Sequence, residues 1–431
     1  MKQRYYDAII LGDSLASQTA GALLVKGGCR VLTFRLRTER PAALSLGPVP
    51  ASRPIERLLE ILGARSCLTQ APSLQVVTRE SRLEIGGEHS IEEELGREFG
   101  ADALQTATQL KSLQQLGEKL ETLLLTSGGL PVSNGGNRLR FFRNALLGRA
   151  LRGNGQTLER FLAPLPTAPR RALTALFAGL ALIPVDRLSV AEAALLWTGV
   201  FCGKTVAVAD FAKLLQQRYE QFHGEEEDLA AIQGASRDRH TLIDLQLKKG
   251  RQCGGAWYLL GSPAGLHPID ETQPSPASQA GATTQRAFTS PLDGLLPPVL
   301  CPINIPGNSF PLRFSLTRKH DHTVGVLDYR TDDDGSDPPS RAAELKHTLV
   351  PLLPFGDFTI EPPLSEPRLS ARRRRSLRSF PNICGDWRVL SNMLLCHGAS
   401  TAPAMGAAGE ILTGMTVAGI LLRELKKPPL F

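Results

Sequence analysis

Residues 6–17 read YDAIILGDSLAS, and this stretch decides the fold. Its first half is apolar enough for a buried parallel strand, and its second half is rich in small residues, as a tight turn requires. Apolar residues at helical spacing follow over 18–26, a glycine pair ends that helix, and 30–34 is a second apolar strand. This order of strand, turn, helix and strand predicts the opening βαβ unit of a dinucleotide-binding domain.

The turn departs from the G-x-G-x-x-G pattern that places a pyrophosphate at a helix N-terminus. Gly12 keeps the first glycine, whereas Ser14 and Ser17 stand at the second and third glycine positions. Arg35 ends the second strand, where an acidic residue normally binds a ribose. It could meet a 2′-phosphate or lie in solvent. The free N–H groups of the helix start, from Leu15 onward, still favour an anion. We therefore predict cofactor-binding positions at all five of these residues.

Composition is that of an enzyme-sized protein and not of a nucleic-acid binder. The chain has 431 residues and is 42% hydrophobic, which predicts two or three domains with a sizeable core. The net charge of +7 is mildly basic, but 6% aromatic residues supply few stacking platforms for nucleic acid. Seven scattered cysteines indicate a reducing compartment. With the first strand at the very start of the sequence, we expect a cytoplasmic protein.

Two apolar stretches and one basic run raise the possibility of membrane association. Residues 172–185 and 191–202 are apolar but too short to cross a bilayer, so buried or interfacial helices are expected. The basic run 372–378 is either a solvated loop or a contact for anionic lipid or an acidic partner.

A second informative segment lies near the C-terminus. A strand over 389–396 leads into residues 398–409, which read GASTAPAMGAAG, and then into a helix over 410–425. Such small residues allow another group to approach the backbone closely, so the loop is either a second cofactor-facing corner or a tight helix–strand contact. We predict four cofactor-binding positions in it: Gly398, Ser400, Gly406 and Gly409.

The middle of the chain supplies elements but no recognisable catalytic group. Residues 204–222 predict an amphipathic helix, and 241–248 and 255–260 predict strands. Residues 275–289 are polar and of low complexity, which is typical of a loop. No zinc-protease spacing of histidines and no G-x-S-x-G motif occurs, so we assign neither a metal site nor catalytic residues.

The two ends together resemble the phytoene desaturase and amine oxidase group of FAD-dependent oxidoreductases. In that group the N-terminal turn holds the FAD pyrophosphate, and a late G-A-G-T-H-P-G-x-G-x-x-G segment lies beside the ribityl chain and flavin. Residues 398–409 match that segment in their small residues, their proline and their last two glycines. Gly203, the helix after it and the strands at 241–260 are similar to the group's middle segment.

The sequence also departs from the group. Arg35 replaces the acidic ribose ligand, Ser14 and Ser17 replace glycines, and Ala402 stands where the late motif has histidine. The resemblance implies FAD as cofactor, and these departures imply that its binding is weakened or lost. Rab GDP-dissociation inhibitors resemble the same group, lack flavin and bind isoprenoid-modified proteins.

These observations predict an α/β protein with a discontinuous Rossmann-like FAD/NAD(P)-binding domain and an inserted α+β substrate domain. The first is expected over 1–75, 200–265 and 380–431, and the second over 76–199 and 266–379. The leading functional hypothesis is an FAD-linked desaturase or oxidase acting on an apolar substrate. The alternative is a cofactor-free protein of the same fold that binds a lipid group or a protein partner, with peripheral membrane contact open and no nucleic acid expected.

Overall fold

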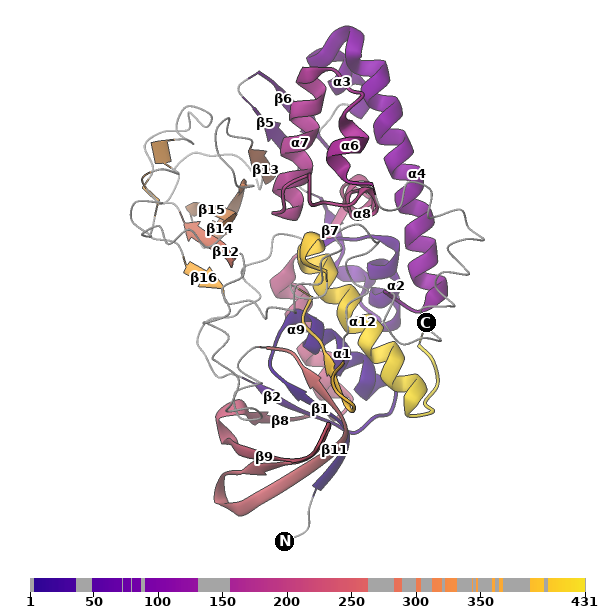
Figure 1. Cartoon of the computed structure of the whole chain (residues 1–431), viewed down its shortest axis with the longest axis vertical. Helices are drawn as coiled ribbons and strands as arrows, with labels where there is room; N and C mark the ends of the chain where they lie inside the picture. Colours follow the sequence, from indigo (N-terminus) through magenta and orange to yellow (C-terminus); the bar gives the residue numbers. More distant parts are fainter. Residues whose placement is uncertain are drawn as a thin grey trace.

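Two large sheets and a small three-stranded sheet, with helices packed against them, make up the fold (Figure 1). The computed structural model describes residues 4–35, 49–71, 73–78, 80–86, 90–130, 156–262, 283–288, 300–303, 312–319, 322–331, 343, 346–347, 359–360, 364–366, 388–398 and 402–430. The structural statements below concern these residues.

Strand β1 (Arg4–Leu11) is the centre of the first sheet. It runs parallel to β2 (Val31–Arg35) on one side and to β11 (Arg251–Leu260) on the other. The parallel row continues with β8 (Glu225–Asp228) beside β2 and with β18 (Met393–Leu395) beside β11. Strands from the beginning, middle and end of the chain thus share one parallel sheet, and the predicted α/β class is confirmed.

Three helices cover one face of this sheet: α1 (Leu15–Lys26), α9 (Val208–Gln221) and α12 (Gly406–Glu424). Helices α1 and α12 cross so closely that a Cβ on Gly414 would lie 2.3 Å from the carbonyl oxygen of Ala16. A larger residue than glycine would push the two helices apart at this point. The crossing brings the start of α1 next to the start of α12, so the two segments that the sequence singled out are neighbours.

Antiparallel strands β9 (Ile232–Asp238) and β10 (Thr241–Leu247) extend from β11 and lie against the opposite face. Because side chains alternate along a strand, β1 contributes to both apolar clusters. Ile10 belongs to the cluster on the helical side, whereas Ile9 belongs to the cluster that includes Leu245. A strand that is buried on both faces explains why residues 8–11 are apolar without alternation.

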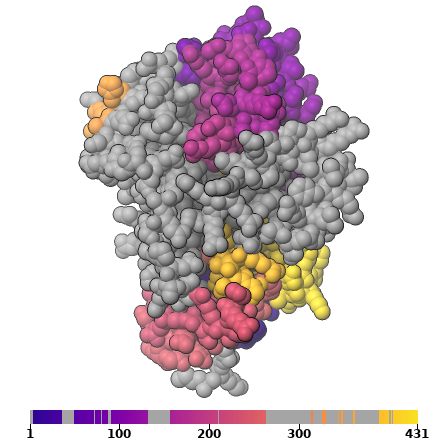
Figure 2. All heavy atoms as spheres, viewed as in Figure 1, coloured from indigo at the N-terminus to yellow at the C-terminus, as the bar shows by residue number. Residues whose placement is uncertain are grey.

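The second sheet has the strand order β16-β12-β15-β14-β13-β5-β6. Its strands are β5 (Leu74–Val77), β6 (Arg82–Ile85), β12 (Thr283–Phe288), β13 (Leu300–Ile303), β14 (Leu312–Lys319), β15 (His322–Thr331) and β16 (Leu364–Glu366). The helices beside it are α3 (Ile91–Phe99), α4 (Ala103–Ser127), α6 (Leu158–Leu162), α7 (Thr167–Ala181) and α8 (Val190–Phe201). Helix α7 packs on β5 and β13. These helices and the β9–β10 hairpin form opposite ends of the molecule (Figure 2).

The three-stranded sheet corrects one expectation from the sequence. Its order is β3 (Val49–Pro50), β7 (Lys204–Val206) and β4 (Thr69–Gln70), with α2 (Arg53–Ile61) following β3. The helix predicted over 204–222 therefore begins only at Val208. Its first three residues pair with β3 and β4 as a strand, which supplies their backbone hydrogen bonds.

Two further expectations about local structure were wrong. Within the polar segment 275–289, residues 283–288 form strand β12, which pairs with β15 and β16. The strand predicted over 389–396 is a hairpin of β17 (Arg388–Leu390) and β18. Its turn carries Asn392, whose Oδ1 accepts a hydrogen bond from the backbone N–H of Leu242 at 3.0 Å. In each case pairing with distant strands decided the structure, and the local sequence carries no trace of that pairing.

The apolar helices of residues 172–202 are packed against the rest of the protein along most of their length. In α7 and α8 the side chains of Phe177 and Trp197 are fully buried, and their rings meet edge to face with centroids 6.2 Å apart. Phe201, at the end of α8, is 40% exposed. No helix among the described residues is long and apolar enough to cross a bilayer. The basic run 372–378 lies outside the described residues, and the predicted domain boundaries stay a prediction.

Candidate functional site

The turn after β1 is held by contacts within the protein. Gly12 has a φ of 118°, and a Cβ there would lie 2.6 Å from the backbone nitrogen of Ser262, so glycine is required. Ser14 caps α1, because its Oγ accepts a hydrogen bond from the N–H of Ser17 at 3.2 Å. The same Oγ donates to the carbonyl oxygen of Cys396 at 3.0 Å. The turn is thereby fastened to the end of β18.

Glu410 places a carboxylate at the N-terminus of α1. The backbone N–H of Ala16 donates to its Oε2 at 3.1 Å, and Glu410 is only 6% exposed. Gly398 packs against the backbone of Glu410, where a Cβ would lie 2.4 Å from the Glu410 Cα. The positive end of the α1 dipole is thus met by an anion that α12 supplies.

Leu15, Ser17 and Arg35 complete the predicted N-terminal site, and all three have partners inside the protein. Leu15 is 5% exposed, and Ser17 is 1% exposed with its Oγ donating to the carbonyl oxygen of Ser14 at 2.9 Å. The Nη2 of Arg35 lies 2.8 Å from Oε1 of Glu226 on the neighbouring strand β8. Arg35 is therefore not a free surface residue, because it pairs with Glu226.

The glycines of the late loop 398–409 have two kinds of surroundings: some pack closely against the backbone, and one lines a cavity. A Cβ on Gly409 would lie 2.7 Å from the carbonyl oxygen of Ala402, so this glycine serves close packing, as Gly398 does. Gly406 differs, because it has a φ of 51° with open space around it and lines a cavity. Ser400 lies outside the described residues. The structure brings the two predicted segments together, while a cofactor-binding role for their residues stays a prediction.

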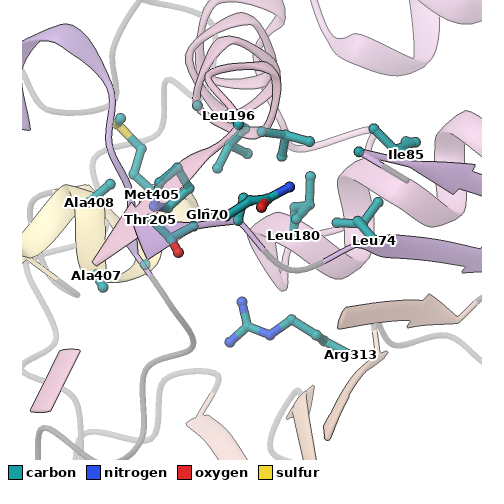
Figure 3. A pocket seen from close by; sticks show the side chains of 17 residues that line it. Gln70, Leu74, Ile85, Leu180, Leu196, Thr205, Arg313, Met405, Ala407 and Ala408 are labelled. Atoms are coloured by element: carbon teal, nitrogen blue, oxygen red, sulfur yellow. The ribbon is translucent and has the colours of Figure 1, made fainter. Parts of the chain in front are cut away.

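The larger of two adjoining cavities lined by described residues (the main cavity) has a volume of about 160 Å³ and lies between the second sheet, helices α7 and α8 and the start of α12 (Figure 3). Most of its wall is apolar: Leu74, Ile85, Leu180, Leu196, Val200 and Met405. Three polar side chains join them, from Gln70, Thr205 and Arg313. An apolar wall with a few polar groups is the usual composition of a small-molecule site.

Arg313 is the one charged residue among the described residues that line the main cavity. It lies on β14 directly opposite Asp328 of β15, and its Nη2 donates to Oδ2 of Asp328 at 2.9 Å. Asp328 is 2% exposed. The Nε of Arg313 is buried without a hydrogen-bond partner. Figure 3 shows the guanidinium extending from its strand into the space framed by Gln70, Thr205 and Leu180.

A smaller cavity of about 40 Å³ adjoins the main one, since the two have wall residues such as Leu196 and Met405 in common. Glu121 of α4 lines it, 2% exposed, with Oε1 buried and without a partner. Its Oε2 lies 3.9 Å from Nε of Arg53. Burial raises the pKa of Glu121 to about 7, although the charge of Arg53 opposes the change.

Sequence reasoning missed Glu410, Arg313, Asp328 and Glu121. Glu410 carries a signal that could have found it, because it is the one charged residue in the otherwise apolar run 406–422. A lone acid in a buried helix needs a partner, and the nearest helix N-terminus can provide it. The other three residues carry no such signal, and only the folded structure shows that Arg313 and Glu121 line cavities and that Asp328 pairs with Arg313.

No protein-family profile and no curated protein matches the sequence. Solved structures do match. Putrescine oxidase bound to putrescine is 12% identical with a TM-score of 0.57, and the alignment covers 98% of this chain and 100% of that one. Cyclohexylamine oxidase from Brevibacterium oxydans is also 12% identical, with a TM-score of 0.55 and the same coverage of both chains. An oxidoreductase from Methanosarcina mazei is 12% identical with a TM-score of 0.59, and the alignment covers 95% of this chain and 99% of that one. The chain therefore has the fold of the FAD-binding amine oxidases.

The α1 turn does not fit the FAD pyrophosphate that this fold implies. A pyrophosphate at the N-terminus of α1 would stand beside the buried carboxylate of Glu410. Two like charges 4 Å apart repel by about 4 kcal/mol at an effective dielectric constant of about 20. The ligand would also have to replace the bond between Ser14 and Cys396. The helix terminus that attracts phosphate in such folds is already neutralised here by the protein.

Proposed function

We propose that this chain uses the flavin-oxidoreductase fold to bind an apolar small molecule or lipid group in the main cavity, without FAD at the α1 turn. The observation that carries the proposal is the apolar main cavity itself, lined by the start of α12, the helix whose Glu410 occupies the N-terminus of α1. Burial of apolar ligand surface would supply the binding free energy, since most of the wall is apolar.

The size of the main cavity sets the scale of the ligand. An apolar cavity of about 150 Å³ in another protein stays dry and binds benzene. A cavity of about 160 Å³ is therefore large enough for a six-membered ring or a short stretch of a lipid chain. A longer ligand would extend beyond the cavity.

A second candidate function is an FAD-linked oxidoreductase that acts on an apolar substrate. The full-length likeness to amine oxidases favours it. If FAD binds, it supplies the redox chemistry, and the protein needs no acid or base of its own. The visible absorbance spectrum of the purified protein separates the two candidates. A bound flavin band that persists through gel filtration would support the second candidate and contradict the first.

Filling the cavity tests the first candidate. Leu196→Trp places a large ring in the main cavity, whereas Leu104→Trp adds the same ring on α4 at a position that is 80% exposed. Organic extraction of each purified protein, followed by mass spectrometry, should recover apolar compounds from the native chain and from Leu104→Trp but not from Leu196→Trp. Equal recovery from both folded variants would contradict a site in this cavity. The same extraction identifies the compound as a free metabolite or a membrane lipid.

A further inference from the structure

In the main cavity, Arg313 can donate hydrogen bonds to a ligand but cannot accept any. The guanidinium of Arg313 has five N–H donors and no acceptor. One donor, on Nη2, is used by Asp328, and the end of the guanidinium faces the main cavity (Figure 3). A ligand group that lies beside Arg313 must therefore provide an acceptor atom, because any donor placed there would leave both groups unsatisfied.

The charge of Arg313 is already balanced. Asp328 lies on the next strand, is 2% exposed and bonds the guanidinium at 2.9 Å. An anionic ligand would therefore bring a second negative charge to a single guanidinium inside an apolar cavity, where an uncompensated charge is strongly disfavoured. A cationic ligand would meet the guanidinium with a like charge. A neutral acceptor avoids both penalties.

We infer that the main cavity selects apolar compounds that carry a neutral carbonyl oxygen, which accepts a hydrogen bond from Arg313. This inference rests on the proposed function and narrows it to a class of ligand. Arg313 would be the residue that determines specificity, while the aliphatic wall contributes most of the affinity. Asp328 would act through Arg313, by keeping the site electrically neutral.

Three ring compounds of similar size test the inference on the full chain. Acetophenone carries a neutral carbonyl, α-methylstyrene replaces that oxygen by a methylene group, and benzoate carries a negative charge. Ligand-observed NMR titrations give a dissociation constant for each. We use the ratio of affinities for acetophenone and α-methylstyrene, because the ratio removes the shared contribution of the apolar ring.

Three variants isolate the role of Arg313. Arg313→Met combined with Asp328→Asn removes both charges, so that no unpaired ion is left buried. In this double variant the ratio should fall by about tenfold, the effect of one lost hydrogen bond to a charged donor. Asp328→Asn alone leaves the guanidinium uncompensated, and benzoate should then bind about tenfold more tightly. Arg251→Met is the matched control, an arginine paired with Glu227 on the surface, and should change neither result.

The outcomes separate the inference from the proposed function. If both neutral probes bind the native protein and the double variant leaves their ratio unchanged, the inference is wrong and the proposed function stands. Benzoate binding as tightly as acetophenone to the native protein would also overturn the inference. If neither neutral probe binds, the proposed function fails and the inference fails with it.

Discussion

The carboxylate of Glu410 accepts a hydrogen bond from the backbone N–H of Ala16 at 3.1 Å, across 394 residues of chain. The bond ties the start of α12 to the start of α1 at the point where a dinucleotide-binding fold normally receives a phosphate. The N-terminus of α1 is therefore present, but its backbone N–H group bonds a side chain of the protein and not a ligand. The protein therefore has the architecture of this fold without implying the cofactor chemistry that is usually found with it.

Glu410→Gln should raise the affinity for FAD by at least about tenfold, because it removes a negative charge from beside the expected pyrophosphate position. The glutamine keeps nearly the same volume and an oxygen that can accept from Ala16. Replacing a charged acceptor by a neutral one should lower the free energy of unfolding by about 1 kcal/mol. Quenching of FAD fluorescence measures the first effect, and urea denaturation measures the second.

Glu192→Gln is the control for this experiment. Glu192 is also buried at a helix N-terminus, where its carboxylate accepts from Ser189 at the start of α8. It should leave the affinity for FAD unchanged. If native protein and Glu410→Gln bind FAD equally well, then the carboxylate is not what closes the turn.

Arg35→Glu should destabilise the protein and not create a ribose site. The new carboxylate would face Glu226, which now pairs with Arg35 at 2.8 Å. Both side chains are partly exposed, so the expected loss is about 1 kcal/mol in the free energy of unfolding. Combining it with Glu226→Arg restores an opposite-charge pair and should recover most of the loss in urea denaturation. A double variant no more stable than Arg35→Glu alone would show that the pair contributes nothing.

The opening βαβ unit could be predicted from sequence because its signals are local. Residues 8–11 are apolar without alternation, which indicates burial on both faces, and Gly12 marks the turn. The late loop 398–409 could be paired with this turn because both are rich in small residues. Close backbone approach, as at Gly398, is the physical requirement behind that pattern.

Strand β8 could not be predicted, because it reads Glu225-Glu226-Glu227-Asp228. Such a run has low strand propensity, and partners on neighbouring segments of the sheet, among them arginines, make it favourable. Arg30 reaches Glu225 at 3.0 Å, and Arg251 reaches Glu227 at 2.8 Å. Arg313 could not be predicted for the same reason, because only the register of β14 and β15 places it opposite its partner Asp328. Charges that are paired across a sheet look like solvated charges in the sequence.

Glu121 should make stability depend on pH. Its pKa is about 7 in the folded protein against an ordinary value of 4.5, so the folded chain keeps a proton that the unfolded chain releases. The free energy of unfolding should therefore fall as pH rises from about 4.5 to about 7, by up to about 3 kcal/mol from this group. Glu121→Gln cannot ionise, so its stability relative to the native protein should increase with pH. Urea denaturation at pH 5 and pH 8 spans most of this range and measures the difference.

The exposed Glu92→Gln serves as the control for the pH experiment, because Glu92 lies in the first turn of α3 away from both cavities. Its stability should follow that of the native protein at both pH values. A difference between Glu121→Gln and the native protein that does not change with pH would mean that Glu121 is ionised throughout this range.

Gly117→Ala should destabilise the protein at the crossing of α4 and α8. A Cβ there would lie 1.8 Å from Oγ1 of Thr198 and 2.4 Å from the carbonyl oxygen of Ala194, and the backbone of α8 cannot move aside without separating the helices. Overpacking of this kind costs about 1–3 kcal/mol, more than the gain of about 1 kcal/mol that alanine brings to a helix. The matched control is Gly96→Ala in α3, where a Cβ would meet nothing within 4 Å. It should raise the midpoint of thermal unfolding, whereas Gly117→Ala should lower it. Two variants that both raise the midpoint would show that α4 and α8 are not packed as closely as this crossing requires.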